Sequence, residues 1–261
     1  MGKLDGRVVV VTGGGRGIGR SLALAAAREG ARVAITSRTQ RELDAVVAEL
    51  RALGSDGLAV TADALSRAET KAALERVLAH FGRIDGLVNN AGGGVGWKRT
   101  PDKDPAEHED ELFEANLKLN LTSAHFATRF ALPAMRAQKW GRVITIGSGY
   151  AKRSGGSLAY TAAKHGLVGY TRALAAQVAS EGITVNCLCP GWTNTSLVDW
   201  NALAKAHGTD AAGAKRIAEA ENLQHRVLEP DELGPMAVLL LSEEARGITG
   251  QVISVDGGYQ V

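Results

Sequence analysis

The sequence predicts an α/β protein with one parallel sheet of seven strands, folded as a single domain over residues 1–261. Short runs rich in Val and Ile alternate along the chain with longer stretches of Ala, Leu, Arg and Glu at helical spacing. This alternation is typical of strand-helix-strand units and therefore of a parallel sheet. No Pro- or Ser-rich linker and no shift of composition divides the chain, and α/β folds often exceed about 200 residues as one unit.

The strands are expected where the Val- and Ile-rich runs occur. The first, Arg7–Thr12, leads through a glycine-rich turn into a helix over Gly17–Glu29. Further strands are expected at Arg32–Ser37, Gly57–Ala62, Ile84–Asn89, Gly141–Gly147, Ile183–Cys189 and Gln251–Val255, and further helices near 39–53, 66–80, 106–137, 158–180 and 230–241.

Two segments interrupt the alternation. Gly93–Pro105 is rich in Gly, Lys and Pro, and Trp192–Gln224 is polar and helical only in fragments. Both follow expected strands, so both should lie at the carboxyl edge of the sheet, where ligands bind in such folds. The stretch near 192–225 is predicted to be a short lid over a substrate.

The charge balance argues against a polyanionic partner. The chain has 30 Lys and Arg against 28 Asp and Glu, a net charge of +2, whereas nucleic-acid and membrane-surface proteins need a concentrated basic field. A signal peptide is not apparent, and nowhere do about 18 apolar residues run together. We therefore expect a cytoplasmic protein with a small-molecule partner, bound to neither nucleic acid nor a membrane.

The two cysteines, Cys187 and Cys189, lie one residue apart in an expected strand, so their side chains should point to the same face. This spacing is too short for the usual zinc sites, and no second pair of ligands follows. They are expected to be buried structural thiols, and no metal site is predicted.

A glycine-rich turn, Thr12-Gly-Gly-Gly-Arg-Gly-Ile-Gly19, joins the first strand to its helix. Glycines at such a turn let backbone amides approach phosphate oxygens at the positive end of the helix. Its spacing is not the common G-x-G-x-x-G, and a plain tight turn is an alternative. A P-loop is another, since Gly14-x-x-x-x-Gly19-Arg20-Ser21 misses that signature only at the Lys that reaches the phosphates.

Further motifs follow later strands: Asn89-Asn90-Ala91-Gly92, then Ser148, then Tyr160-Thr-Ala-Ala-Lys164 on a helix. Residues four apart share a helical face, with about 5–6 Å between their Cβ atoms. An ammonium beside Tyr160 favours the phenolate, so this residue is a candidate general acid or base. The alternative is a surface tyrosine beside a solvated lysine.

With these motifs in order, the sequence resembles the short-chain dehydrogenase/reductase family over nearly the whole chain, from Thr12 to Gly258. The resemblance implies a doubly wound Rossmann sheet, a nicotinamide cofactor, hydride transfer at a carbonyl or secondary alcohol, and a homotetramer. It assigns a catalytic tetrad to Asn120, Ser148, Tyr160 and Lys164. Ser148 would hydrogen-bond the carbonyl oxygen, Tyr160 would protonate it, Lys164 would also hold the nicotinamide ribose, and Asn120 would hold a water that returns the proton.

Asn116 could replace Asn120 in this scheme, because the two are four residues apart. Asn120 is preferred because the following Leu-Thr-Ser-Ala-His-Phe resembles the family sequence, which leaves Asn116 as an expected exposed helix residue. The expected cofactor contacts are Gly13, Arg16, Gly17, Ile18, Gly19, Ser37, Arg38, Asp63, Ala64, Asn90, Ala91, Gly92, Tyr160, Lys164, Pro190, Gly191, Thr193 and Thr195.

The end of the second strand predicts the cofactor. An NAD site places Asp or Glu there, whereas an NADP site avoids that charge and supplies Arg. Here the strand ends at Ser37-Arg38, with Arg16 in the glycine turn nearby. NADP(H) is therefore favoured, and NAD(H) stays the alternative.

Two subfamilies with different substrates share sequence features with this chain. Segments at 131–136 and 189–192 resemble 3-hydroxybutyrate dehydrogenases, while Thr12–Gly19 and the end of the chain resemble 3-oxoacyl carrier-protein reductases equally well. Ser157 stands where the former carry a carboxylate-binding Lys. Lys139 fits the basic surface of the latter, but Glu181 does not. A 3-oxoacyl thioester is the leading expectation.

The alternatives are a small hydroxy acid, a polyol or another secondary alcohol, and, more remotely, a cofactor-binding module without catalysis. Lys152 and Arg153 follow Ser148 in a loop that is expected to border the mouth of the pocket, where they would hold an anionic group; a solvated basic loop is the alternative.

Overall fold

The computed structural model describes residues 2–95 and 104–260. Over this part of the chain seven strands form one sheet in the order β3-β2-β1-β4-β5-β6-β7, and every neighbouring pair is parallel. The strands are β1 (Val8–Thr12), β2 (Arg32–Ser37), β3 (Gly57–Thr61), β4 (Gly86–Asn89), β5 (Gly141–Ile146), β6 (Ile183–Pro190) and β7 (Val252–Val255). The predicted α/β class and the seven-stranded parallel sheet are confirmed.

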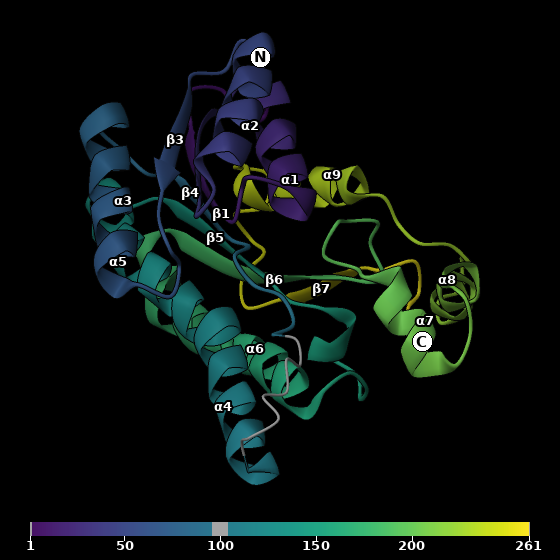
Figure 1. Ribbon diagram of the computed structural model, residues 1–261. Helices are drawn as coiled ribbons and strands as arrows, with labels where there is room; N and C mark the ends of the chain where they lie inside the picture. Colours follow the sequence, from purple (N-terminus) through teal and green to yellow (C-terminus); the bar gives the residue numbers. More distant parts are fainter. Residues whose placement is uncertain (1, 96–103, 261) are drawn as a thin grey trace.

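Helices cover both faces of the sheet (Figure 1). One face packs against α1 (Gly17–Arg28), α2 (Gln40–Ala52) and α9 (Gly234–Leu241), and the other against α3 (Arg67–Phe81), α5 (Ser123–Gln138) and α6 (Leu158–Val178). In β1, Val9 and Val11 join the first core while Val8 and Val10 join the second. Burial on both faces explains why the strands are continuous apolar runs rather than alternating ones. The doubly wound arrangement is therefore confirmed.

Strand β1 lies between β2 and β4. The strands up to β3 are therefore added on one side of β1 and the strands from β4 onward on its other side. The chain after β1 leads to α1 on one face of the sheet, and the chain after β4 leads on to α5 on the other face. Ligands bind in open α/β sheets at the carboxyl edge of such a point.

The single helix predicted over 106–137 is wrong in its middle. The chain forms α4 (Pro105–Leu117), then a π-helical turn over Lys118–Thr122, then α5. A π turn inserts one extra residue, and such turns often occur at functional sites. Hydrophobic periodicity does not register an insertion of one residue, which is why the sequence indicated an unbroken helix.

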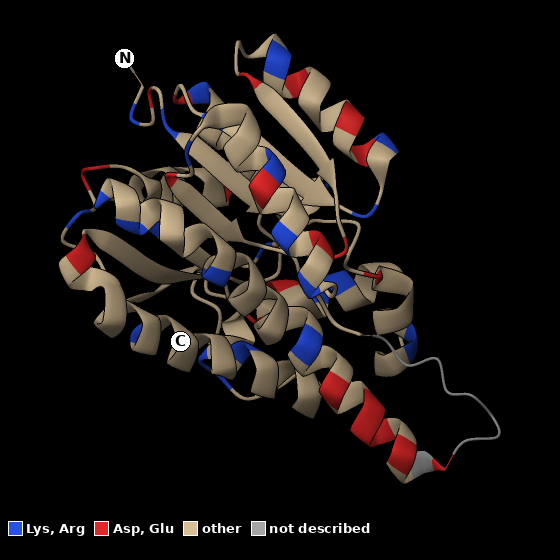
Figure 2. Ribbon diagram, turned by 90° about the vertical axis from the view of Figure 1, so that its left-hand side faces the viewer, with Lys and Arg blue, Asp and Glu red and all other residues tan. Residues whose placement is uncertain are grey.

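Helix α4 carries a cluster of acidic residues along its outer part (Figure 2). Its cap is Asp104, whose side chain accepts a hydrogen bond from the Ala106 amide at 3.2 Å, and Glu107 lies in its first turn. Negative side chains here match the positive end of the helix dipole. The charge of this helix is thus consistent with a local, structural role.

The segment after β6 is helical in fragments, as expected. It contains α7 (Trp200–His207) and α8 (Ala211–Ala220), which stand beside the sheet in Figure 1. Isolated bridges tie the segment to the fold, from Thr193 to Leu228 and from Asn222 to Tyr259. Among the helices of the described residues, none combines the length and apolarity needed to cross a membrane.

Candidate active site

A cavity of about 1070 Å³ opens at the carboxyl edge of the sheet. Its walls include the glycine turn after β1, the end of β2, the segment after β4, Ser148 after β5 and the segment after β6. Every predicted site residue lines it except Gly19 and Asn120, which lie immediately behind its wall. The residues that the sequence placed on seven separate elements are therefore brought together.

The glycine turn has the backbone shape that an anion requires. Gly13 and Gly17 have φ values of 65° and 53°, in the left-handed region that favours glycine. A Cβ at Gly19 would collide with the Gly13 carbonyl oxygen and the Asn90 amide. Helix α1 then begins without an acidic residue in its first turn and without a side-chain cap. Its first N–H groups are thus left for an outside acceptor such as a diphosphate.

The segment after β4 is fastened to this turn. The Thr12 hydroxyl accepts hydrogen bonds from the amides of Asn90 and Ala91, both at 3.1 Å. In return, the Asn90 side-chain amide donates to the carbonyl oxygens of Thr12 and Gly13, both at 3.0 Å. The two loops therefore form one rigid floor to the cavity.

Asn120 holds the next part of that floor from behind. Its Oδ1 accepts from the Gly93 amide at 2.9 Å, and its Nδ2 donates to the carbonyl oxygens of Gly93 at 3.0 Å and Asn116 at 3.1 Å. A Cβ at Gly92 would lie 2.8 Å from Asn120 Oδ1 and 3.5 Å from Lys164 Nζ. Only a glycine lets these three groups approach so closely.

The expectation that Asn116 is exposed is wrong, because the residue is only 2% exposed. Its Oδ1 accepts from the Val95 amide at 3.3 Å and its Nδ2 donates to the Leu112 carbonyl oxygen at 2.8 Å. Asn116 and Asn120 thus both fix the segment after β4, at successive points. Residues four apart lie on the same side of a helix. The sequence alone does not show whether the side that carries Asn116 and Asn120 is buried or exposed to solvent.

Tyr160 and Lys164 share one face of α6, as predicted, and both line the cavity. The Ser157 hydroxyl caps this helix by accepting from the Tyr160 amide at 3.3 Å. Lys164 Nζ lies 5.5 Å from the centre of the Tyr160 ring and donates to the Ile146 carbonyl oxygen at 2.9 Å. The alternative of a solvated lysine is wrong, because Lys164 is only 5% exposed. Ser148, whose hydroxyl accepts from the Tyr150 amide at 3.2 Å, completes this end of the cavity.

The cavity is also lined by two tyrosines that the sequence did not indicate, Tyr150 and Tyr259. Tyr150 lies edge-to-face with both Tyr160 and Tyr259, with ring centres 6.4 and 5.9 Å apart. Tyr259, two residues from the end of the chain, reaches this position over Gly149, where a Cβ would lie 2.5 Å from its ring. Burial raises the pKa of Tyr150 and of Tyr259, because a phenolate is poorly solvated there. Both hydroxyls therefore stay protonated at neutral pH.

The far end of the cavity collects charged groups around the glycine turn. Arg16, Ser37 and Arg38 lie there, as predicted. The structure adds Glu42, whose carboxylate is 3.8 Å from the Arg16 guanidinium. Its only signal in the sequence is its place in the first turn of α2, five residues after Ser37.

Asp63 lines the same end of the cavity. Its carboxylate accepts from the Leu65 amide at 2.9 Å, while Ser66 caps α3 by accepting from the Glu69 amide at 3.2 Å. Ser66, rather than Asp63, is therefore the cap of α3.

Lys152 and Arg153 are not part of the cavity wall, contrary to expectation. The Lys152 ammonium donates instead to the hydroxyl of Ser254 on β7. Since neither residue lines the cavity, the two give no support to an anionic substrate.

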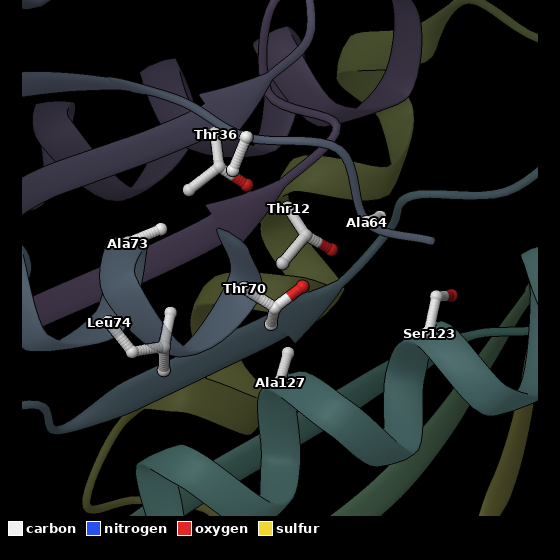
Figure 3. Close-up of a pocket in the computed structure, with 9 residues that line it drawn as sticks. Thr12, Thr36, Ala64, Thr70, Ala73, Leu74, Ser123 and Ala127 are labelled. Atoms are coloured by element: carbon white, nitrogen blue, oxygen red, sulfur yellow. The ribbon is translucent and has the colours of Figure 1, made fainter. Parts of the chain in front are cut away.

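A separate, closed cavity lies beside the first one and shares Thr36, Ala62 and Ala64 with it. Figure 3 shows hydroxyls of Thr12, Thr36, Thr70 and Ser123 around it. Its volume of about 10 Å³ suits about one water molecule. Within the described residues, the Thr70 hydroxyl is buried and has no hydrogen-bond partner. This small cavity has room for no organic ligand.

Cys187 and Cys189 are buried free thiols on β6, as predicted, with their sulfur atoms 3.7 Å apart. The hydrogen bond from the Cys189 thiol and the nearby Lys164 ammonium lower the pKa of Cys187, against the effect of burial. In the described part of the chain, no group of three His, Cys, Asp or Glu side chains could hold a metal ion.

Comparison with known proteins places this geometry in context. The family model described as short chain dehydrogenase matches residues 7–205. The chain is 38% identical to the D-beta-hydroxybutyrate dehydrogenase of Cupriavidus necator, over 98% of both chains, and 34% identical to the 3-oxoacyl-[acyl-carrier-protein] reductase of Escherichia coli, over 97% of both.

Solved structures of enzymes resemble this fold over nearly its whole length. Levodione reductase superimposes with a TM-score of 0.88 at 31% identity, over 97% of both chains. A variant of actinorhodin polyketide ketoreductase, solved with NADPH, has a TM-score of 0.87 at 32% identity, over 100% of this chain and 99% of that one.

Proposed function

Since the chain belongs to the short-chain dehydrogenase/reductase family, and is thus an oxidoreductase acting on CH-OH and carbonyl groups with NAD(P), we propose that it is an NADP(H)-dependent reductase. The proposed substrate is a 3-oxoacyl thioester. One observation carries the proposal: Ser148, Tyr160 and Lys164 meet in the same cavity as the glycine turn and the arginines at its far end. A hydride donor bound along that cavity would have its phosphates at one end and its reactive end beside Tyr160.

The proton chemistry belongs to Tyr160. Its phenol would donate a proton to the carbonyl oxygen, and the Ser148 hydroxyl would hydrogen-bond the same oxygen. The buried Lys164 ammonium lies 5.5 Å from the centre of the same ring, on the same face of α6. NADPH, when bound, supplies the hydride.

Asn120 has a positioning role in this proposal. Both ends of its side-chain amide are already used on backbone groups, chiefly those of Gly93. The residue therefore acts by holding the cavity floor opposite Lys164. Its expected second role, holding a water that returns the proton, stays a prediction.

The residues present fit a dinucleotide phosphate. Gly13, Gly15 and Gly17 contribute no side chains of their own to this turn, and α1 begins with uncapped N–H groups that a diphosphate could use. Arg16 and Arg38 would bind the 2′-phosphate that distinguishes NADP(H), with Ser37 in place of the acidic residue of an NAD site.

The lining of the cavity supports an apolar substrate. The segments after β4 and β6 contribute Val95, Ala115, Leu119, Leu197, Val198 and Leu203 to its wall. An acyl chain or a ring would bury favourably against these side chains. A small hydroxy acid, the alternative suggested by the hydroxybutyrate dehydrogenase relative, would need a cation for its carboxylate. Lys152 and Arg153 do not line the cavity, and Lys118 is the lysine beside Leu119 that does.

The segment near 192–225 is proposed as the lid over this substrate, since residues between Thr195 and Leu203 contribute a wall of the cavity.

A homotetramer remains a proposal, for which light scattering should give four times the 27.3 kDa of one chain. Leu167, Thr171 and Leu174 of α6 are buried, and the partly exposed Val168 and Tyr170 also pack against the chain's own core. The free thiols of Cys187 and Cys189 support a reducing, cytoplasmic location.

Tyr160→Phe tests the mechanism, because it removes only the phenol oxygen. General acid catalysis contributes about 10²–10⁴-fold, so kcat should fall at least about a hundredfold. Cofactor affinity, measured by the fluorescence of bound NADPH, should stay within a fewfold of wild type. Lys164→Ala should reduce both the rate and the affinity.

Tyr170→Phe is the matched control, since Tyr170 lies on the same helix outside the cavity. Activity of Tyr160→Phe close to that of the control, in protein that binds NADPH, would refute the mechanism.

The substrate proposal is tested with acetoacetyl thioester, acetoacetate and a cyclic diketone. The thioester should give the highest kcat/KM, and a higher value for acetoacetate would overturn the choice.

A further inference from the structure

One carboxylate lies where the proposed cofactor carries its most distinctive charge. Glu42 lines the end of the cavity formed by Arg16, Ser37 and Arg38. Its side chain is 36% exposed and its Oε1 lies 3.8 Å from an Arg16 nitrogen. A Cβ at Gly15 would lie 3.0 Å from the Ser37 hydroxyl oxygen and 3.3 Å from Glu42 Oε2. The hydroxyl and the carboxylate therefore converge on the same point above the glycine turn.

This arrangement has opposite consequences for the two nicotinamide cofactors. A carboxylate repels the 2′-phosphate of NADP(H) and occupies Arg16, which would otherwise bind that phosphate. The same carboxylate can accept a hydrogen bond from the 2′-hydroxyl of NAD(H), as an acidic residue does in NAD sites. The sequence contains no acidic residue at the end of β2, but the fold supplies one from the first turn of α2.

We propose that Glu42 is a specificity-determining residue that limits the preference for NADP(H) and lets the site accept NAD(H) as well. The inference rests on the proposed nicotinamide site at this end of the cavity. The Arg16 to Glu42 contact is long and partly exposed, so the arginine can turn from the carboxylate to a phosphate at little cost. Glu42 thus competes with the 2′-phosphate rather than blocking it.

A second pair between the same two helices provides the matched control. Arg20 of α1 and Glu49 of α2 form a two-point ion pair, with Arg20 Nε 2.9 Å from Glu49 Oε1. Glu49 is 39% exposed, close to the value for Glu42, but it does not line the cavity. Glu49→Gln therefore removes the same charge from the same helix without touching the cofactor site.

The experiment measures the Kd of NADPH and of NADH, by nicotinamide fluorescence, for wild type, Glu42→Gln and Glu49→Gln. Removing one charge close to a phosphate at a partly exposed site should tighten NADPH binding about 5- to 30-fold. NADH binding should stay the same or weaken, and added salt should reduce the effect. Glu49→Gln should change neither Kd.

A ratio of the two Kd values within twofold of wild type in Glu42→Gln would overturn the inference, and so would an equal change in Glu49→Gln. A wild type that prefers NADH would contradict the proposed NADP(H) preference. If the ratio still shifts in Glu42→Gln, the role of Glu42 stands, so the two failures can be told apart. Matching thermal unfolding curves would establish that all three proteins are folded.

Discussion

The substitution Asn120→Ala should separate the support of the cavity floor from the chemistry above it. The residue is 2% exposed and its side chain makes three hydrogen bonds to backbone groups, at 2.9, 3.0 and 3.1 Å. At about 1 kcal/mol net for each bond, their loss should lower the free energy of unfolding by about 3 kcal/mol. For a chain of this size, that corresponds to a fall in Tm of about 6–12 °C.

The functional effect follows from which groups are released. Gly93 loses the two hydrogen bonds that its backbone makes to the Asn120 side chain. The segment from Gly92 to Gly94, which lines the cavity beside Lys164, is then no longer held in place. NADPH affinity should therefore fall together with kcat, whereas Tyr160→Phe should lower kcat alone. Asn116→Ala is the control, since it removes two bonds, to Val95 and Leu112, and leaves those to Gly93 intact.

The measurements are thermal unfolding, an NADPH titration and steady-state kinetics on the three proteins. Asn116→Ala should be destabilised by about 2 kcal/mol with NADPH affinity near that of wild type. An Asn120→Ala protein with an unchanged Tm would show that the three bonds do not hold the floor. One that loses stability but keeps its cofactor affinity would refute the link between Gly93 and the cofactor.

Two further predictions concern stability. Thr70→Val replaces a buried hydroxyl that has no partner in the described part of the chain with a methyl group of similar size, so it should raise the free energy of unfolding by about 1 kcal/mol; a lower Tm would show that the hydroxyl is satisfied, for example by a water in the adjoining cavity. The Arg226 guanidinium and the Glu229 amide lower the pKa of Glu232 to about 2 from its ordinary 4.5, so this carboxylate stabilises the fold above pH 4.5 and loses that effect as the pH falls towards 2. Because the pair is largely exposed, Glu232→Gln should cost less than about 1 kcal/mol at pH 7 and progressively less in acid; a difference in Tm that stays constant from pH 7 to pH 3 would contradict this assignment.

The amino-acid sequence by itself determined the elements whose cause is local. The Val-rich runs form strands buried on both faces, because a strand places successive side chains on opposite sides and here both sides are apolar. Gly13 and Gly17 marked a turn that needs positive φ, and the four-residue spacing put Tyr160 and Lys164 on one helical face. Each of these inferences depends only on residues that are close together in the sequence.

The tertiary structure decided what depends on packing between distant segments. Asn116 lies in α4 and Asn120 in the π turn that follows it, and only their contacts with the segment after β4 show that both are buried and hydrogen-bonded. Glu42 reaches the point above Gly15 because α1 and α2 pack on the same face of the sheet. Tyr259 joins the cavity because β7 pairs with β6 and returns the end of the chain to Gly149. Such contacts are set by strand order and helix packing, which join residues that no local pattern relates, and they decide which charges and hydroxyls face the cavity.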